Sequence, residues 1–182
     1  WEIGFDGALF HHRLSVGFTY YRQTTSDALV WVPQFQGSPR RDDLTNVGAI
    51  QNRGIELQID ASVLRSESWS LYAGLGITTN NSELLDLGGA EPYGDLNGQL
   101  LVGHPVPANF GRRVADPEAI NGPWSSDRYA VGDNGVVGGR IALGPQLPTH
   151  FVSPSVSLGV PGGVVVTARG EYRGGNMRNV NP

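Results

Sequence analysis

The residues of this chain that could perform chemistry are few and scattered. His11 and His12 are adjacent, so on a strand their side chains point to opposite faces and do not readily bind one metal ion. His104 and His150 stand alone in loop-like sequence. The sequence has no cysteine and no G-x-S-x-G, H-E-x-x-H or phosphate-loop motif. We therefore expect no enzymatic activity, no metal site and no cofactor.

One group of charged residues does follow a pattern. Arg169, Glu171 and Arg173 alternate with small or apolar residues near the end of the chain. On a strand, side chains two positions apart share a face, so these three charges would lie together. Such a face contacts either water with local ion pairing or a polar partner, and the residues alone leave both interpretations open.

The elements that must position these residues are long strands. Alternation with a period of two, typical of β-structure, recurs along the chain, whereas helical periodicity is nearly absent. The alternating runs are 2–10, 14–23, 55–64, 69–78, 152–160 and 164–173. Soluble strands average ~5–6 residues. A run of about ten residues, tilted by ~40°, spans roughly 25 Å, which is the apolar band of an outer-membrane barrel.

The connections between the runs alternate in length. Short turns fall at 11–13, 65–68 and 161–163, and long connections span roughly 24–50 and 80–149, the second without sustained alternation. Outer-membrane barrels combine short periplasmic turns with long extracellular loops. A half-buried sheet of a soluble sandwich also alternates, but loops above ~12–15 residues are uncommon in compact domains. Strand length and loop asymmetry therefore favour a membrane barrel.

Composition excludes some functional classes. The 182 residues carry a formal net charge of −4, which does not match the basic surface of a nucleic-acid-binding protein. Charged residues make up 16%, against roughly 25% in an ordinary soluble domain. No apolar stretch is long enough for a transmembrane helix.

The segment 46–56, Asn-Val-Gly-Ala-Ile-Gln-Asn-Arg-Gly-Ile-Glu, resembles a motif of TonB-dependent outer-membrane receptors. The family pattern is N-x-G-x-I-x-N-x-G-V/I-E, at the entry to a barrel strand. The segments 2–6, 103–105 and 145–148 are similar to pieces of the SusC/RagA-like branch. In this chain Gly48 and Gly54 would relieve backbone crowding where a loop enters a strand.

The resemblance implies an all-β fold: an antiparallel meander of long strands, about six in number, that is part of a large transmembrane β-barrel and not closed by itself. Residues 1–182 would be a partial receptor barrel, since the large plugged barrels have ~22 strands. The plug domain and the TonB-contacting segment would lie outside this chain, which would be a fragment located in the bacterial outer membrane.

The function implied is active import of an oligomeric nutrient, a glycan or a peptide, by a TonB-dependent transporter. The alternatives are a siderophore or cobalamin receptor of the same family, or a soluble or surface-anchored β-rich carbohydrate-binding module. The implied partners are outer-membrane lipid, the TonB complex through the missing N-terminal part, and a SusD-like surface lipoprotein. Nucleic acid is not among them.

Two sets of residues are candidates for contact with a substrate. The first set would face the barrel lumen: Glu56, Gln58, Asp60, Tyr72, Arg169, Glu171 and Arg173. The second set consists of loop aromatics on which sugars could stack: Trp31, Phe35, Tyr93, Trp124 and Tyr129. Tyr20, Tyr21, Trp69 and Tyr172 lie near strand ends, where aromatic belts at the membrane interfaces explain them.

Overall fold

The computed structural model describes residues 1–33, 42–89, 93–95, 98–112 and 140–177. The chain divides into two compact units, which are described separately. Unit 1 comprises Trp1–Thr24, Gln51–Ser82 and Pro148–Gly175. Unit 2 comprises Thr25–Ile50, Glu83–Leu147 and Asn176–Pro182.

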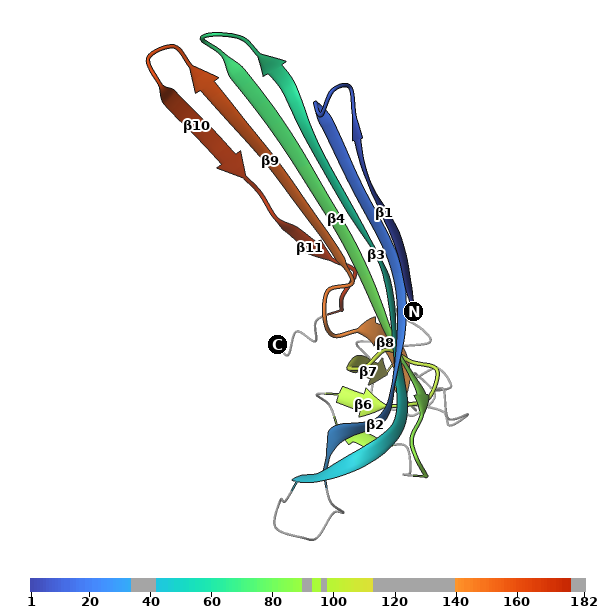
Figure 1. Cartoon of the computed structure of the whole chain (residues 1–182). Helices are drawn as coiled ribbons and strands as arrows, with labels where there is room; N and C mark the ends of the chain where they lie inside the picture. The colour runs from blue at the N-terminus through green and yellow to red at the C-terminus, as the bar shows by residue number, and fades with distance from the viewer. Residues whose placement is uncertain (34–41, 90–92, 96–97, 113–139, 178–182) are drawn as a thin grey trace, which may run out of the picture. The chain divides into compact units, whose positions relative to one another are not determined.

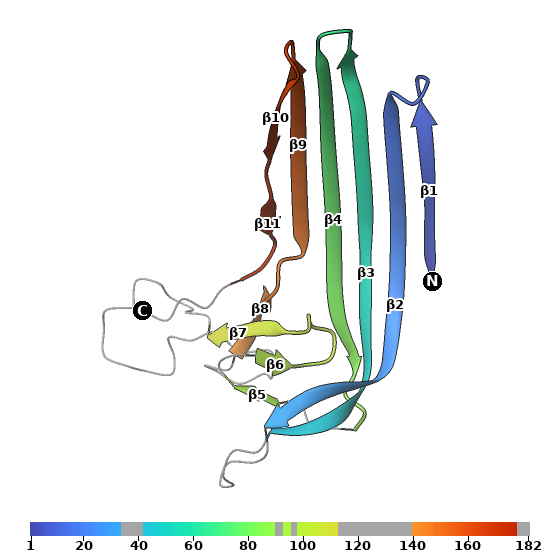
Figure 2. The same cartoon turned by 60° about the vertical axis from the view of Figure 1, so that its left-hand side comes forward.

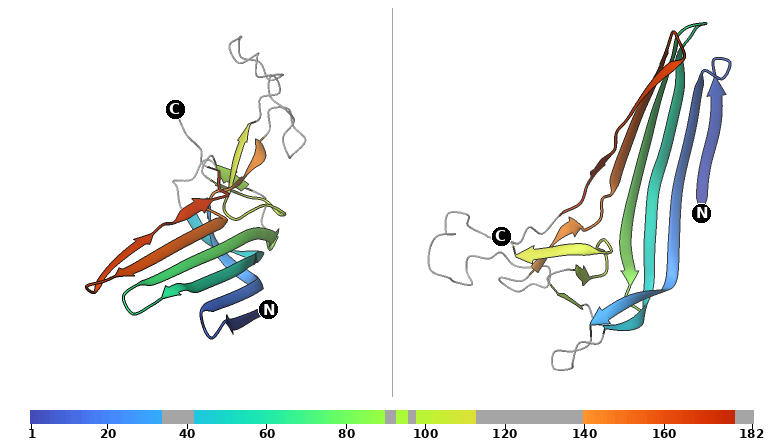
Figure 3. Two further views of the ribbon diagram at one scale, coloured as in Figure 1. Left: turned by 90° about the horizontal axis from the view of Figure 1, so that it is seen from above. Right: turned by 90° about the vertical axis from the view of Figure 1, so that its left-hand side faces the viewer.

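Unit 1 is one layer of antiparallel strands (Figures 1 and 2). The strand order is β1-β2-β3-β4-β9-β10, and β11 also pairs with β9. The strands are β1 (Glu2–Leu9), β2 (Leu14–Pro33), β3 (Asp42–Arg65), β4 (Ser70–Asp86), β9 (His150–Val160), β10 (Val164–Arg169) and β11 (Tyr172–Gly174). Residues 25–33 of β2, 42–50 of β3 and 83–86 of β4 belong to unit 2. No pairing joins β1 to β10 among the described strands, so the sheet is open, and Figure 3 shows these two strands at its opposite edges.

Side-chain alternation explains the register of the sheet. In the β1–β2 hairpin, Phe5 lies opposite Phe18, and their rings stack with centroids 5.8 Å apart. Trp1 and Tyr20 continue this row of aromatics, with centroids 5.3 Å apart. The row occupies the apolar face that the alternation predicts, because cross-strand partners project to the same side of a sheet.

The turn of this hairpin is unusual. The connection has four residues, and Phe10, His11 and His12 have φ values of 54°, 57° and 63°. Non-glycine residues rarely adopt this left-handed conformation, which costs roughly 1–2 kcal/mol per residue. Three of the four described non-glycine residues with positive φ therefore lie in this one turn, and the fourth is Asp27 in β2.

The predicted sixth run is interrupted. Strand β10 ends at Arg169 and β11 begins at Tyr172, although both keep the same register against β9. The Gly170 amide donates to the Pro154 carbonyl at 3.0 Å, but proline has no N–H to return the bond. The missing hydrogen bond explains why regular pairing lapses at this point.

Unit 2 contains a four-stranded sheet in the order β5-β6-β7-β8. Its strands are β5 (Tyr93–Asp95), β6 (Gly98–Leu100), β7 (Ala108–Arg112) and β8 (Arg140–Pro145). Leu84, Leu87 and Leu100 form a buried cluster in this unit, and Ala28, Ile50 and Val106 pack against it. Unit 2 thus has a small apolar core of its own.

The observed architecture confirms the predicted all-β, open antiparallel meander and differs from the sequence-based expectation in two details. Strands β2, β3 and β4 have 20, 24 and 17 residues, not about ten, so much of the expected loop 24–50 is strand. The stretch 80–149, expected to be irregular, contains the end of β4 and all of β5–β8. In the described part of the chain, no helix is long and apolar enough to cross a membrane.

Candidate functional site

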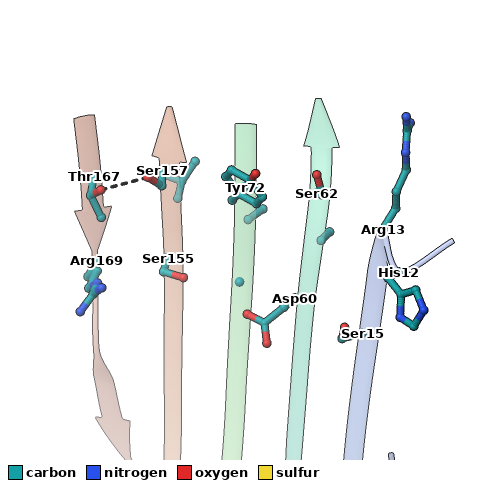
Figure 4. Close-up of a pocket in the computed structure, with 14 residues that line it drawn as sticks. His12, Arg13, Ser15, Asp60, Ser62, Tyr72, Ser155, Ser157, Thr167 and Arg169 are labelled. Carbon is teal, nitrogen blue, oxygen red and sulfur yellow. Dashed lines mark hydrogen bonds between the residues drawn. The ribbon is translucent and has the colours of Figure 1, made fainter. Parts of the chain in front are cut away.

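The polar face of the unit 1 sheet carries the candidate site. Hydroxyl, carboxylate and guanidinium groups from five neighbouring strands project to this side (Figure 4). They surround an open cavity of about 300 Å³. The polar side chains that line it are His12, Arg13, Ser15, Asp60, Ser62, Tyr72, Ser155, Ser157, Thr167 and Arg169.

Two cross-strand rows organise one side of this cavity. In the first row Tyr72 lies opposite Ser157, and Ser157 lies opposite Thr167. The hydroxyls of Ser157 and Thr167 are hydrogen-bonded at 3.1 Å, as the dashed line in Figure 4 shows. In the second row, Gly74 lies opposite Ser155, which in turn lies opposite Arg169. Small residues thus form a low floor beneath the longer charged side chains.

Asp60 marks the acidic side of the cavity. One of its carboxylate oxygens accepts a hydrogen bond from the Gln58 amide at 3.0 Å. The other reaches over Gly74, where an added Cβ would lie only 2.9 Å from it. The same added Cβ would lie 2.6 Å from the Ser155 hydroxyl, so the glycine leaves room for both polar groups.

Opposite charges are separated across the floor. Asp60 is on β3 and Arg169 is on β10, with β4 and β9 between them. Three strand spacings amount to roughly 14 Å, which is too far for an ion pair. Within the described residues, no salt bridge involves Asp60, Arg13 or Arg169, although Glu171 and Arg173 pair with each other. The arrangement can donate and accept hydrogen bonds and can orient a dipolar or charged group.

The structure brings together only part of the predicted lumen-facing set. Asp60, Tyr72 and Arg169 line the same cavity, and Gln58 contacts Asp60. Glu56 is exposed on β3 but does not line this cavity.

The remaining two lumen-facing candidates form a pair of their own. Glu171 and Arg173 make an exposed ion pair beyond the end of β10. They therefore lie outside the hydroxyl-lined cavity, and their charges largely compensate each other.

Three of the five predicted loop aromatics lie outside the residues that the structure describes. Trp31 and Tyr93 belong to strands β2 and β5, respectively. Phe35, Trp124 and Tyr129 lie outside the described residues. Their stacking with sugars stays a prediction.

Sequence reasoning missed the hydroxyls and the turn residues of the cavity. Ser15, Ser155, Ser157 and Thr167 carry no motif, but each has the strand parity of a residue already on the polar face. Alternation places them on the polar faces of their runs, but without a motif it does not single them out as site residues. Arg13 gave no such signal, because it lies in a turn where alternation does not apply.

The histidines and acidic residues of the described chain do not gather in one place. The described residues contain no group of three or more histidine, aspartate or glutamate side chains arranged to hold an ion. His12 lines the cavity, whereas its neighbour His11 does not, consistent with their divergent directions.

Comparison with known proteins agrees with the geometry. The model of the TonB dependent receptor-like β-barrel family matches residues 1–174. The chain belongs to this family. Because the family consists of outer-membrane barrels, the open sheet of unit 1 is a section of a bacterial outer-membrane β-barrel.

Curated relatives are much longer than this chain. TonB-dependent receptor P26 of Formosa agariphila (strain DSM 15362 / KCTC 12365 / LMG 23005 / KMM 3901 / M-2Alg 35-1) is 28% identical over 150 residues, which is 76% of this chain and 14% of the receptor. TonB-dependent receptor P39 of the same organism is 33% identical over 101 residues, or 56% of this chain and 10% of that receptor. The chain thus spans about a seventh of the length of the first relative.

Solved structures show the same fold. The structure of the RagAB peptide transporter matches with a TM-score of 0.77 and 20% identity, covering 96% of this chain and 20% of that one. The RagAB peptide importer in the open-open state gives a TM-score of 0.72 at 22% identity, covering 96% and 20% of the two chains. The predicted resemblance to the SusC/RagA-like branch is confirmed at the level of the fold.

Proposed function

We propose that the full-length protein is an outer-membrane transporter that actively imports an oligomeric nutrient, and that this chain forms part of its barrel wall. The single observation that carries the proposal is a sheet of long strands with one polar and one exposed apolar face, in a chain of the TonB-dependent receptor family. Soluble sandwiches pack their apolar faces against a second layer. Unit 1 has no such layer in the described residues.

The two faces suggest the orientation of the wall. Ile3, Phe5 and Val166 are 65%, 60% and 60% exposed on the apolar face. Charge on a lipid-facing position is costly, whereas the barrel interior is polar. We therefore assign the apolar face to lipid and the polar face, with Asp60 and Arg169, to the lumen.

The cargo is proposed to be a peptide or a glycan. Hydroxyls, a carboxylate and a guanidinium on a low floor suit a polar oligomer that exchanges hydrogen bonds along its length. The likeness to the RagAB peptide transporter supports an oligomeric cargo. Sugar stacking on Trp31, Phe35, Tyr93, Trp124 or Tyr129 would be the signature of a glycan.

The energy for import and the capture of the oligomer at the cell surface would come from partners outside this chain. We propose that the TonB complex acts through an N-terminal part that these residues do not include. A surface lipoprotein of the SusD type would deliver the oligomer to the extracellular side. Both proposals follow from family membership and concern the whole receptor.

Deletion of the full-length gene tests this function. Uptake of labelled oligopeptides and of labelled oligosaccharides is measured in the parent, the deletion strain and the complemented strain, with and without a protonophore. We expect one class of oligomer to lose energy-dependent uptake on deletion and to regain it on complementation. Unchanged uptake of both classes, with loss of ferric siderophore or cobalamin uptake, would contradict the proposal and favour the alternative receptor class.

A further inference from the structure

The second glycine of the 46–56 motif has a structural partner that the proposed function does not explain. Gly54 is buried on β3, with the parity of the polar face. The side chain of Tyr21, on β2, reaches two residues of β4: its hydroxyl donates to the Asn80 side-chain oxygen at 3.1 Å and to the Thr79 carbonyl at 3.4 Å. Because β3 lies between β2 and β4, the tyrosine must cross β3 to make these contacts.

The crossing takes place at Gly54. A Cβ added there would lie 2.7 Å from Cζ of Tyr21, closer than real Cβ contacts permit. It would also overlap the Thr79 carbonyl oxygen of β4. The adjacent Ile55 amide donates to the Thr79 hydroxyl at 3.1 Å, which holds the two backbones close at this level. The position therefore excludes a side chain for two independent reasons.

A contact of this kind would help to specify the register of the sheet. Register is weakly specified where strands are long and rich in glycine and serine, because a slipped pairing loses few specific contacts. Strands β2 and β3 have 20 and 24 residues. Glycine and serine also occupy much of the polar face of β4 and β9, at Gly74, Gly76 and Ser155. A two-residue slip of β2 against β3 would keep Tyr21 on the polar face but would place its ring on a residue with a side chain, Asn52 or Glu56.

We propose that Tyr21, Gly54 and Asn80 form a register lock, in which the tyrosine passes over the glycine of β3 and fixes three consecutive strands to one another. The lock assigns a role to the glycine of the motif: the absence of a side chain at Gly54 leaves room for the ring to lie over β3 and reach β4. The lock concerns assembly of the wall and is independent of what the transporter carries.

Engineered disulfides can report the register directly, because the sequence contains no cysteine. A Cβ at Gly17 would lie 3.9 Å from Cβ of Gln58, which suits a disulfide between β2 and β3. A Cβ at Gly76 would lie 3.7 Å from Cβ of Ser153, which gives a matched pair between β4 and β9. In the full-length receptor, any cysteines elsewhere are first replaced, and each pair is oxidised after refolding from urea into detergent micelles.

The lock is then removed in each reporter background. Tyr21→Ala should abolish most of the Gly17→Cys/Gln58→Cys cross-link and leave the Gly76→Cys/Ser153→Cys cross-link unchanged. Tyr72→Ala removes a tyrosine from the same face without disturbing the lock, and should leave both cross-links unchanged. Full retention of the first cross-link in Tyr21→Ala, or equal losses in Tyr21→Ala and Tyr72→Ala, would overturn the proposal.

Two further comparisons keep the test decisive if Tyr21→Ala does not refold. Tyr21→Phe and Asn80→Ala should each raise the unfolding equilibrium constant about two- to tenfold, and the double variant no more than the larger single effect. Gly54→Ala should lose most of the folded barrel. At Gly74 the atoms within 3 Å of an added Cβ are side-chain atoms of Asp60 and Ser155, which can move, so Gly74→Ala should retain the folded barrel. Additive effects in the first pair, or equal folding in the second, would show that no lock exists.

Discussion

The two units differ in the burial of their apolar side chains. All the buried hydrophobic residues among the described positions, such as Leu84 and Phe110, belong to unit 2. Unit 1 is richer in alternating apolar residues, yet Ile3, Phe5 and Val166 are more than half exposed. The apolar side chains of unit 2 cover one another, whereas no second layer among the described residues covers the apolar face of unit 1. The buried apolar residues and the exposed apolar residues of the described chain therefore belong mainly to different units.

The contrast teaches that alternation alone does not reveal a core. A strand with one apolar face is stable in water only when a second layer covers that face. The opposite face of the sheet is polar, and Asp60 and Arg169 on that face would be costly in lipid, which is why the polar face is proposed to line the lumen. The substitutions below test this assignment, first in the core of unit 2 and then on the two faces of unit 1.

The largest loss of stability is expected in the core of unit 2. Leu84 is fully buried, and Leu84→Ala should destabilise the unit by about 2–5 kcal/mol through lost contacts and a cavity. Hydrogen exchange of the Gly103 amide, which donates to the Leu84 carbonyl, would report the loss in the full-length receptor. Leu85→Ala is the control, since Leu85 is 38% exposed. Equal acceleration in both variants would mean that unit 2 lacks a specific core.

The next effect separates the two faces of β3. Ile59→Arg would place a cation on the proposed lipid face and should cost about 2–4 kcal/mol, whereas Gln58→Arg points to the lumen beside Asp60 and should fold normally. The fraction of full-length barrel that shows heat-modifiable mobility on a gel measures folding. A worse defect for Gln58→Arg would reverse the assignment of the faces.

Much of unit 1 could be predicted from the sequence. Its six runs alternate in sequence, and short turns such as 65–68 join them in pairs, so the presence of the strands and their pairing as hairpins follow from local pattern. The full lengths of β2, β3 and β4 do not. Phe5 and Phe18 share a face by parity alone, and the structure pairs them. The candidate site could be predicted only in part. Its serines and threonines form a common surface only because strands distant in sequence, such as β4 and β9, are neighbours in the sheet.

Other features could not be predicted for identifiable physical reasons. Strands β5 and β6 have three residues each, which is too short for a period of two to be visible. The interruption between β10 and β11 is caused by Pro154, which lies on a different strand. The passage of Tyr21 over Gly54 joins positions on different strands, and neither residue alone signals the contact. Each feature depends on a tertiary partner.

A smaller gain in stability is expected at the β1–β2 turn. His11 has a φ of 57°, a conformation that glycine adopts without the steric penalty of a side chain. His11→Gly should stabilise the barrel by about 1 kcal/mol after allowance for the extra freedom of glycine in the unfolded chain. Arg13 is not among the residues with positive φ, so Arg13→Gly should destabilise instead. Urea unfolding of the full-length receptor in micelles distinguishes the two variants.

The smallest effect on stability is expected on the polar face itself. The hydrogen bond between Ser157 and Thr167 is exposed, and such cross-strand pairs contribute roughly 0.2–1 kcal/mol. Thr167→Val keeps the shape of the side chain and its β-branching but removes the hydroxyl, so the barrel should fold almost as well as the parent. If the polar face contacts the cargo, uptake should fall although the amount of folded receptor does not. Val166→Thr is the matched control: it adds a hydroxyl to the apolar face of the same strand and should leave uptake unchanged in the folded fraction. A loss of folding with Thr167→Val as large as with Leu84→Ala would mean that the polar face acts as a core and not as the wall of a channel.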